Sequence, residues 1–300
     1  MLYRGRFAPT PSGPLHFGSL VAALASWLDA RWHQGEWYLR IDDIDPPRVQ
    51  PGAADRILSQ LEHLGLCWDG PVRYQSDRHA AYDEAIAQLL RDGHAFYCTL
   101  TRKQLSALDH CHPGISAAVD PGPDRAIRLA VADSALCFED RIQGQVCANL
   151  QQQGGAFVLK RRDGLVGYQL ACALDDADDR ITHVVRGSDL LDSTLRQCWL
   201  LHCLQRNAPA YAHFPVVTAG REHKLSKSAG DQALDVAHAS TLLVHALGCL
   251  EIDVEPGLMQ ASVGDILAWG LAHYDPQRLP RGLSIPLPEA LKQKMAPSSP

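Results

Sequence analysis

Hydrophobic and polar positions follow two different periods over the first ninety residues of the chain. Short apolar runs over 3–8 and 37–41 predict β-strands, and turn-forming residues over 9–14 end the first of them. Helices are predicted where apolar residues recur at helical spacing, over 18–32, 53–66 and 82–92. Strand, helix, strand, helix is the order of a parallel sheet wound with helices.

The pattern weakens between about 95 and 155, where proline and glycine crowd the region 113–123. We expect an inserted subdomain here with irregular structure and short strands, such as 126–131. Further on, strand-like runs lie at 157–160, 165–168, 182–186 and 214–218, with a helix over 190–204. A polar loop over 220–230 and a mainly helical stretch over 234–273 complete the pattern, and the proline-rich tail from Pro276 is predicted to be loosely held.

These elements predict an α/β fold: a Rossmann-type, doubly wound parallel sheet with an irregular inserted subdomain and a short helical C-terminal region. A chain of 300 residues forms one large domain or two modest ones. No apolar run approaches the roughly 20 residues that span a bilayer, and the N-terminus lacks the layout of a signal peptide. We therefore expect a cytoplasmic protein without a membrane segment.

Charge and cysteine content narrow the class of protein further. The net charge of −6 argues against nonspecific coating of nucleic acid, but it leaves room for a local basic face. The most basic run, Lys160-Arg161-Arg162, is more typical of a solvated hairpin turn than of a tRNA-binding face. The 9 cysteines are scattered without paired spacing, which predicts reduced thiols and no disulfide framework.

Three segments carry the candidate chemistry: 6–19, 40–45 and 224–228. The first puts His16 and Gly18 where a strand turns into a helix, and a helix N-terminus offers free N–H groups to a phosphate. The third, Lys224-Leu225-Ser226-Lys227-Ser228, can bring ammonium groups over a departing pyrophosphate. Taken alone, the first is typical of a helix cap and the third of an exposed loop; their conjunction and order indicate a nucleotide-activating enzyme.

These residues resemble the class I aminoacyl-tRNA synthetases, whose signatures are called HIGH and KMSKS. Here the two signatures read His16-Phe17-Gly18-Ser19 and Lys224-Leu225-Ser226-Lys227-Ser228. The flanking sequences RFAPTPSG and RIDDID are similar to the branch of the family that activates glutamate. The resemblance runs from about residue 4 to about 230 and is weakest over 100–155.

Within that branch the chain resembles the short paralogues, the glutamyl-queuosine tRNA(Asp) synthetase family. Only 72 residues follow Ser228, the first signature continues as H-F-G-S-L, and Asp45-Pro46-Pro47-Arg48 follows the acidic cluster. The resemblance implies ATP-dependent activation of L-glutamate without tRNA, and transfer of the glutamyl group to the queuosine base at the wobble position of tRNA(Asp). It implies ATP, with Mg²⁺, as a substrate rather than a bound cofactor, and we expect a monomer.

The resemblance also divides the chain. We expect residues 1–94 to form the first half of the catalytic domain and 95–155 an inserted, acceptor-type subdomain. Residues 156–230 would form the second half with the KLSKS loop. The remaining residues, 231–300, would form a helical region without an anticodon-binding domain.

Site residues follow from the resemblance, position by position. The glutamate-binding positions of the family fall on Arg6, Phe7, Ala8, Pro9, Thr10, Asp42, Tyr168 and Arg186. Asp42 stands where the family has a glutamate that holds the substrate ammonium, so this arm is one methylene shorter. The ATP-binding positions fall on His16, Gly18, Ser19, Lys224 and Lys227, of which His16 and Lys227 are the predicted catalytic pair. Read without the resemblance, Tyr168 is an aromatic packed on a sheet and Arg186 a surface ion pair with Asp189.

The inserted subdomain departs from the family. Short paralogues carry a zinc site of the form C-x-C, then a tyrosine, then a cysteine four residues later. Here Cys98-Thr99-Leu100 lacks the second cysteine, and His112 and Ser116 stand at the tyrosine and last cysteine. A structural zinc needs four ligands, and only Cys98 and His112 align, with Cys111 as a further thiol. We therefore predict no metal site.

Three alternatives remain open from the sequence. A nucleotidyltransferase shares the histidine-glycine turn but does not pair it with RFAPTPSG and KLSKS. A non-catalytic tRNA-binding paralogue is disfavoured by the intact His16, Gly18 and Lys227. A truncated glutamyl-tRNA synthetase that charges a tRNA 3′ end would carry the same motifs.

Overall fold

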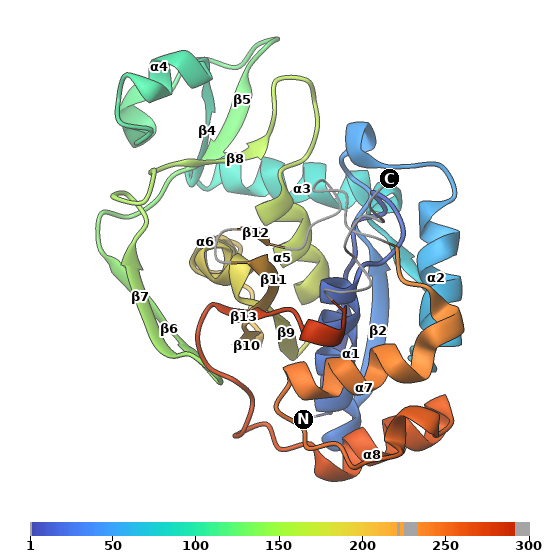
Figure 1. Ribbon diagram of the computed structural model, residues 1–300. Helices are drawn as coiled ribbons and strands as arrows, with labels where there is room; N and C mark the ends of the chain where they lie inside the picture. Colours follow the sequence, from blue (N-terminus) through green and yellow to red (C-terminus); the bar gives the residue numbers. More distant parts are fainter. Residues whose placement is uncertain (1, 221–222, 225–232, 292–300) are drawn as a thin grey trace, which may run out of the picture.

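A computed structural model describes residues 2–220, 223–224 and 233–291, and it places a parallel sheet at the centre of the fold (Figure 1). One part of the sheet has the order β1-β2-β3, with all neighbours parallel. These strands are β1 (Arg4–Phe7), β2 (Glu36–Ile41) and β3 (Arg73–Tyr74). The two strands predicted near the N-terminus are therefore confirmed.

A second part of the sheet continues beyond β1. Strands β9 (His183–Gly187) and β10 (Ala210–Phe214) are parallel neighbours, and the Thr182 N–H donates to the Arg4 carbonyl at 2.9 Å. This bond sets β9 beside β1, so the spatial order is β3-β2-β1-β9-β10. Such an order, with its reversal at β1, is that of a Rossmann-type α/β sheet.

Helices cover the sheet on both faces, as the doubly wound prediction requires. One apolar cluster joins β1 and β2 to four helices: α1 (Phe17–Trp32), α2 (Ala53–His63), α7 (Ala239–Cys249) and α8 (Val263–His273). The other cluster is built on three helices: α3 (His79–Arg91), α5 (Tyr168–Asp178) and α6 (Leu191–Cys203). No helix among the described residues is long and apolar enough to cross a membrane.

The inserted region is more regular than the sequence predicted. Its strands β4 (Ala95–Cys98) and β5 (Ala126–Leu129) form an antiparallel sheet with β8 (Phe157–Lys160), which follows the region in the chain, and α4 (Arg102–Ser106) lies between β4 and β5 in sequence. An antiparallel ribbon of β6 (Ala135–Asp140) and β7 (Gly144–Asn149) leaves this sheet, and its turn end meets β10 where Asp140 pairs with Tyr211. In Figure 1 the sheet projects above the core and the ribbon runs down one side.

Two further expectations need correction. The strand-like run at 165–168 ends in helix α5, whose first residue is Tyr168, and this helix was not predicted. Its residues 170–176 are all buried, so it lacks the one-sided apolar stripe by which a helix is recognised in sequence. The tail is also less loose than expected, because β13 (Ser284–Pro286) pairs with β11 (Val216–Gly220), itself paired with β12 (His223–Lys224).

The expectation that all cysteines are reduced is contradicted. Cys137 and Cys147 form a disulfide between facing positions of the β6–β7 ribbon, with Cα atoms 4.1 Å apart. A separation of 10 residues in sequence becomes a direct contact because the hairpin folds the two strands against each other. The other seven cysteines are free thiols.

Candidate active site

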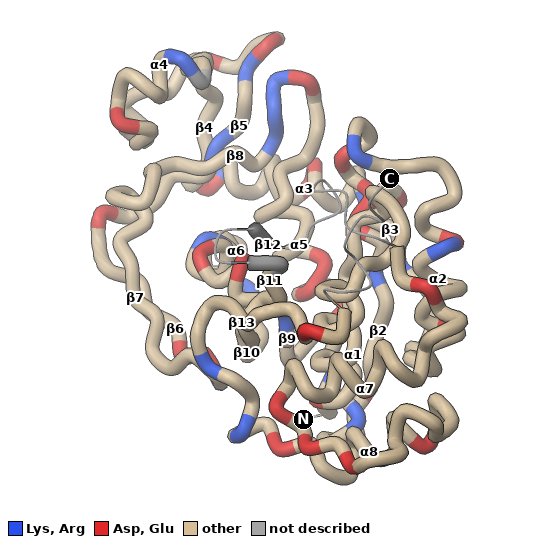
Figure 2. The backbone as a smooth tube through the Cα atoms, in the orientation of Figure 1, with Lys and Arg blue, Asp and Glu red and all other residues tan. Residues whose placement is uncertain are grey.

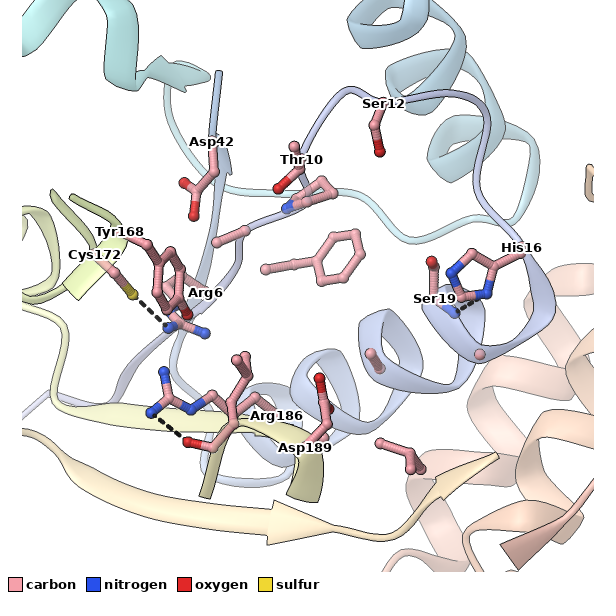
Figure 3. A pocket seen from close by; sticks show the side chains of 18 of the residues that line it. Arg6, Thr10, Ser12, His16, Ser19, Asp42, Tyr168, Cys172, Arg186 and Asp189 are labelled. Carbon is pink, nitrogen blue, oxygen red and sulfur yellow. Dashed lines mark hydrogen bonds between the residues drawn. The ribbon is translucent and has the colours of Figure 1, made fainter. Parts of the chain in front are cut away.

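A cavity of about 650 Å³ opens at the carboxyl ends of β1 and β9, next to the start of α1 (Figure 3). In an α/β sheet of this kind the carboxyl edge at the strand-order reversal is where ligands bind. Most of the predicted site residues line this cavity: Arg6, Phe7, Ala8, Pro9, Thr10, His16, Gly18, Ser19, Asp42, Tyr168 and Arg186. Of the two predicted lysines, Lys224 belongs to β12, and Lys227 lies outside the described residues.

The start of α1 forms one end of the cavity. His16 is the N-cap residue, and its Nδ1 accepts the Ser19 N–H at 3.3 Å. His16 therefore caps the helix, as its motif alone would predict, and the same side chain also lines the cavity. The helix begins at Phe17 with a glycine in its first turn, which leaves its N-terminal backbone accessible to an anion.

The opposite end of the cavity holds a buried charge network that begins at Arg6. Arg6 donates two hydrogen bonds to the Asp176 carboxylate of α5, from Nε and Nη2, at 3.1 Å each. Asp176 also accepts a hydrogen bond from Arg40 Nη1 at 2.6 Å. Burial alone would raise the pKa of the Asp176 carboxyl, but the two guanidinium groups lower it to about 2. Asp176 is thus an anion that holds Arg6 in place from behind the cavity wall.

Arg6 keeps its charge in this environment. Burial opposes its charged form, but the facing Asp176 carboxylate outweighs burial and raises the pKa of Arg6 above its ordinary value. Arg40 extends the network to Asp42, since its Nε donates to Asp42 Oδ1 at 2.7 Å. Burial raises the pKa of Asp42, although Arg40 acts against this shift. Asp42 faces the cavity and would meet a cationic group there (Figure 3).

Arg186 approaches the same end of the cavity from β9. It is 5% exposed, which rules out a surface ion pair, and its Nη1 is buried without a hydrogen-bond partner. Tyr168 lies next to it at the first turn of α5, and burial raises the pKa of its hydroxyl, which stays protonated. Two guanidinium groups, Arg6 and Arg186, therefore face one region of the cavity (Figure 3), an arrangement that suits a carboxylate.

Several residues of the site were missed at the level of sequence. Asp176 and Cys172 come from the unpredicted helix α5, and Cys172 Sγ lies 3.8 Å from Arg6 Nη2. The acidic residues Asp175-Asp176 directly after the apolar run 170–174 were the available signal, because buried carboxylates require cationic partners. Asp140 and His213, which contact each other behind Arg186, gave no comparable signal.

The region of the expected zinc position holds a hydrogen-bonded pair. Cys98 Sγ lies 3.1 Å from His112 Nε2, and both residues are buried. Burial, with Arg128 nearby, lowers the pKa of His112 to about 4. Cys111 turns to the Gln151 carbonyl, to which its thiol donates at 2.9 Å. Within the described ranges no group of three His, Cys, Asp or Glu side chains could hold a metal, so these residues do not fit a zinc ion.

Comparison with known proteins assigns the class. Residues 3–120 and 115–242 match the family described as tRNA synthetases class I (E and Q), catalytic domain, and the chain belongs to this family. It is 50% identical over 285 residues to the glutamyl-Q tRNA(Asp) synthetase of Pseudomonas fluorescens, covering 95% of this chain and 96% of that protein. The glutamyl-Q tRNA(Asp) synthetase of Pseudomonas aeruginosa is 49% identical, with 95% and 97% covered.

Solved structures agree on the fold. A glutamate tRNA ligase from Elizabethkingia meningosepticum, in complex with its amino acid, superposes with a TM-score of 0.77 at 22% identity. The match covers 98% of this chain and 69% of that one. The glutamate-tRNA synthetase from Elizabethkingia anophelis gives a TM-score of 0.78 at 22% identity, covering 98% and 70%. The Rossmann-type prediction is confirmed.

Proposed function

We propose that this protein activates L-glutamate with ATP, without tRNA, and transfers the glutamyl group to the queuosine base at the wobble position of tRNA(Asp). The observation that carries the activation step is the cavity itself. It joins two buried guanidinium groups and a buried carboxylate to the N-terminus of α1. The similarity to the glutamyl-Q tRNA(Asp) synthetases over 95% of the chain supports the acceptor.

Glutamate carries two carboxylates and one ammonium, and the cavity offers partners of matching charge. In our proposal Arg6 and Arg186 hold carboxylate oxygens, and Tyr168 adds a hydroxyl donor. Asp42 holds the ammonium: its Oδ1 is engaged by Arg40, so Oδ2 is the oxygen to receive the substrate. An ammonium beside Asp42 favours its ionised form and offsets the effect of burial on its pKa. The chain from Phe7 to Thr10 forms the floor beneath the ligand.

ATP would lie with its phosphates at the start of α1. A carboxylate oxygen of glutamate attacks the α-phosphorus, the bond to the leaving oxygen breaks, and pyrophosphate departs. His16, Gly18 and Ser19 contact the nucleotide, and Lys224 and Lys227 neutralise the leaving group, to which Mg²⁺ would add further positive charge. A hydroxyl of the queuosine base then attacks the activated carbonyl and releases AMP. No residue acts as a nucleophile, so rate enhancement comes from positioning and charge stabilisation.

The remaining parts of the proposal concern the setting of the enzyme. We propose a monomer that works in the cytoplasm, with glutamate, ATP and queuosine-containing tRNA(Asp) as its partners. The division at 1–94, 95–155, 156–230 and 231–300 stays part of the same proposal, with the inserted subdomain and the catalytic halves in the roles given above.

Zinc is not required in this proposal. We expect the purified protein to contain no stoichiometric zinc, and a chelator to leave its melting temperature unchanged, because Cys98 and His112 satisfy each other. Elemental analysis and thermal unfolding with and without chelator measure this directly. About one zinc per chain, lost together with stability on chelation, would contradict the expectation and point to Cys98, Cys111 and His112.

Activation of glutamate without tRNA tests the first half-reaction. Pyrophosphate exchange into ATP should depend on glutamate and proceed with no tRNA present, since the described cavity already holds its charged groups in ion pairs and hydrogen bonds. Aspartate in place of glutamate is the matched control and should support little exchange. Exchange that appears only when tRNA is added would favour a truncated tRNA-charging enzyme, and no exchange at all would favour a non-catalytic paralogue.

A further inference from the structure

The unpartnered nitrogen of Arg186 is aimed by contacts on the other side of its guanidinium group. Nη2 donates to Thr194 Oγ1 at 2.8 Å and to Gln197 Oε1 at 2.9 Å, both from α6. Nε donates to His213 Nε2 at 3.0 Å. These bonds occupy Nε and Nη2 and leave Nη1 as the nitrogen without a partner.

His213 lies on β10 and is completely buried, and it links Arg186 to a carboxylate. Its Nδ1 lies 2.6 Å from Asp140 Oδ2. Because Nε2 accepts the Arg186 N–H, the imidazole proton must be on Nδ1, from where it is donated to Asp140. Asp140 Oδ1 in turn accepts the backbone N–H groups of Ile142, Gln143 and His213, at 3.0, 2.9 and 3.1 Å.

The surroundings of Asp140 and His213 keep the His213 imidazole neutral. Burial lowers the pKa of His213, and Arg186 acts in the same direction, although the Asp140 hydrogen bond opposes them. Burial works to raise the pKa of Asp140, but its bonds to His213 and Gln143 outweigh this and lower it. Near neutral pH the chain of hydrogen bonds therefore runs from the Asp140 carboxylate through the neutral His213 imidazole to the Arg186 guanidinium. A second imidazole proton would set an N–H against the Arg186 N–H and remove the acceptor.

We propose that Asp140 and His213 are positioning residues for glutamate, acting through Arg186. They fix the tautomer that accepts from Arg186 Nε and so direct Nη1 at the substrate carboxylate. Asp140 ends β6, so the ribbon of the inserted region contributes to the glutamate pocket through this pair. The inference rests on the proposed function, in which Arg186 binds glutamate.

Two substitutions of His213 separate the roles of its two ring nitrogens, Nδ1 and Nε2. The amide of His213→Asn reaches the Nδ1 position, where it can donate to Asp140, but it leaves Arg186 Nε without an acceptor. The amide oxygen of His213→Gln reaches the Nε2 position and can accept from Arg186. We expect His213→Asn to raise the glutamate KM about 10-fold to 30-fold, as for a buried donor left unpaired, with the ATP KM unchanged. His213→Gln should raise the glutamate KM less than His213→Asn does.

Asp140→Asn gives a nearly isosteric second variant. Its amide N–H₂ facing His213 would favour the opposite tautomer, so the glutamate KM should again rise with the ATP KM unchanged. Equal rises for His213→Asn and His213→Gln, or equal rises in the two KM values, would show a role in folding only and overturn the inference. Melting temperatures recorded alongside identify loss of fold.

Arg186→Gln in the same assay separates the inference from the function on which it rests. If Arg186→Gln leaves the glutamate KM unchanged, the assignment of Arg186 to glutamate is wrong. If Arg186→Gln raises the glutamate KM while His213→Asn and Asp140→Asn do not, the proposed function stands and the positioning role is refuted. A rise for Arg186→Gln, His213→Asn and Asp140→Asn, with rescue by His213→Gln, is the outcome that supports both.

Discussion

Arg6→Ala is expected to raise the glutamate KM of the exchange reaction by about 30-fold to 4000-fold while the ATP KM stays nearly unchanged. Losing one partner of a desolvated charge pair costs roughly 2–5 kcal/mol, which corresponds to that range. Arg6 is 5% exposed and stays charged beside Asp176, so a carboxylate that meets it in the cavity is stripped of water. In the proposed function ATP lies at the start of α1, and Arg6 lies at the other end of the cavity.

Arg4→Ala is the matched control for this prediction. Arg4 lies two residues earlier on the same strand, pairs with Glu36 at 2.8 Å and lines a different cleft. The Arg4→Ala substitution should leave the KM values for glutamate and ATP unchanged. Arg6→Ala also leaves Asp176 with Arg40 as its remaining arginine partner, so melting temperatures of both variants are needed to separate binding from folding. Equal losses of glutamate and ATP affinity in folded Arg6→Ala would contradict the assignment of Arg6 to glutamate.

Lys227→Ala should lower kcat for exchange by about 100-fold to 1000-fold, the size expected when one charge-stabilising donor is lost. Lys227 lies outside the described residues, and the prediction rests on its place in Lys224-Leu225-Ser226-Lys227-Ser228 after strand β11. An ammonium that neutralises departing pyrophosphate interacts more strongly in the transition state than in the ground state. Its removal should therefore affect kcat more than either KM.

Lys160→Ala serves as the control for a lysine of ordinary surface character. Its ammonium pairs with Asp83 at 2.6 Å, and its side chain is partly exposed on β8. Exchange kinetics of this variant should match those of the unmodified protein in the absence of tRNA. If Lys227→Ala behaves like Lys160→Ala, the KLSKS loop contributes only to structure, and the proposed stabilisation of pyrophosphate fails.

The elements with one-sided burial were readable from the sequence. Helix α2 buries Ala53, Ile57 and Leu61 at spacings of four, while most of its other positions are polar, and this period marks a helix on a core. The same holds for the strand-to-helix turn at His16, which was predicted from the sequence and which lines the cavity at the start of α1. The other end of the cavity, with Arg6, Asp42, Tyr168 and Arg186, was predicted only through the resemblance to a family, because its residues come from distant elements.

The sequence did not predict the buried residues that support the site from behind the cavity wall: Asp176, Asp140 and His213. Helix α5 is buried over seven consecutive positions, 170–176, so its apolar period is lost, and with it the partner of Arg6. Asp140 precedes an arginine at the end of a hairpin strand, where an exposed ion pair is the ordinary interpretation. His213 stands between Ala212 and Phe214 in a strand and has no signal of its own; its role appears only when β10 brings it to Arg186.

Transfer of labelled glutamate to tRNA(Asp) tests the central claim most directly. The protein, ATP and labelled glutamate are incubated with queuosine-containing tRNA(Asp) from which the 3′-terminal adenosine has been removed, and with the same truncated tRNA lacking queuosine. The account predicts that label enters the first tRNA and not the second, and that it is recovered in the anticodon fragment after nuclease digestion. Transfer that requires the intact 3′ end, or that occurs equally without queuosine, would contradict it.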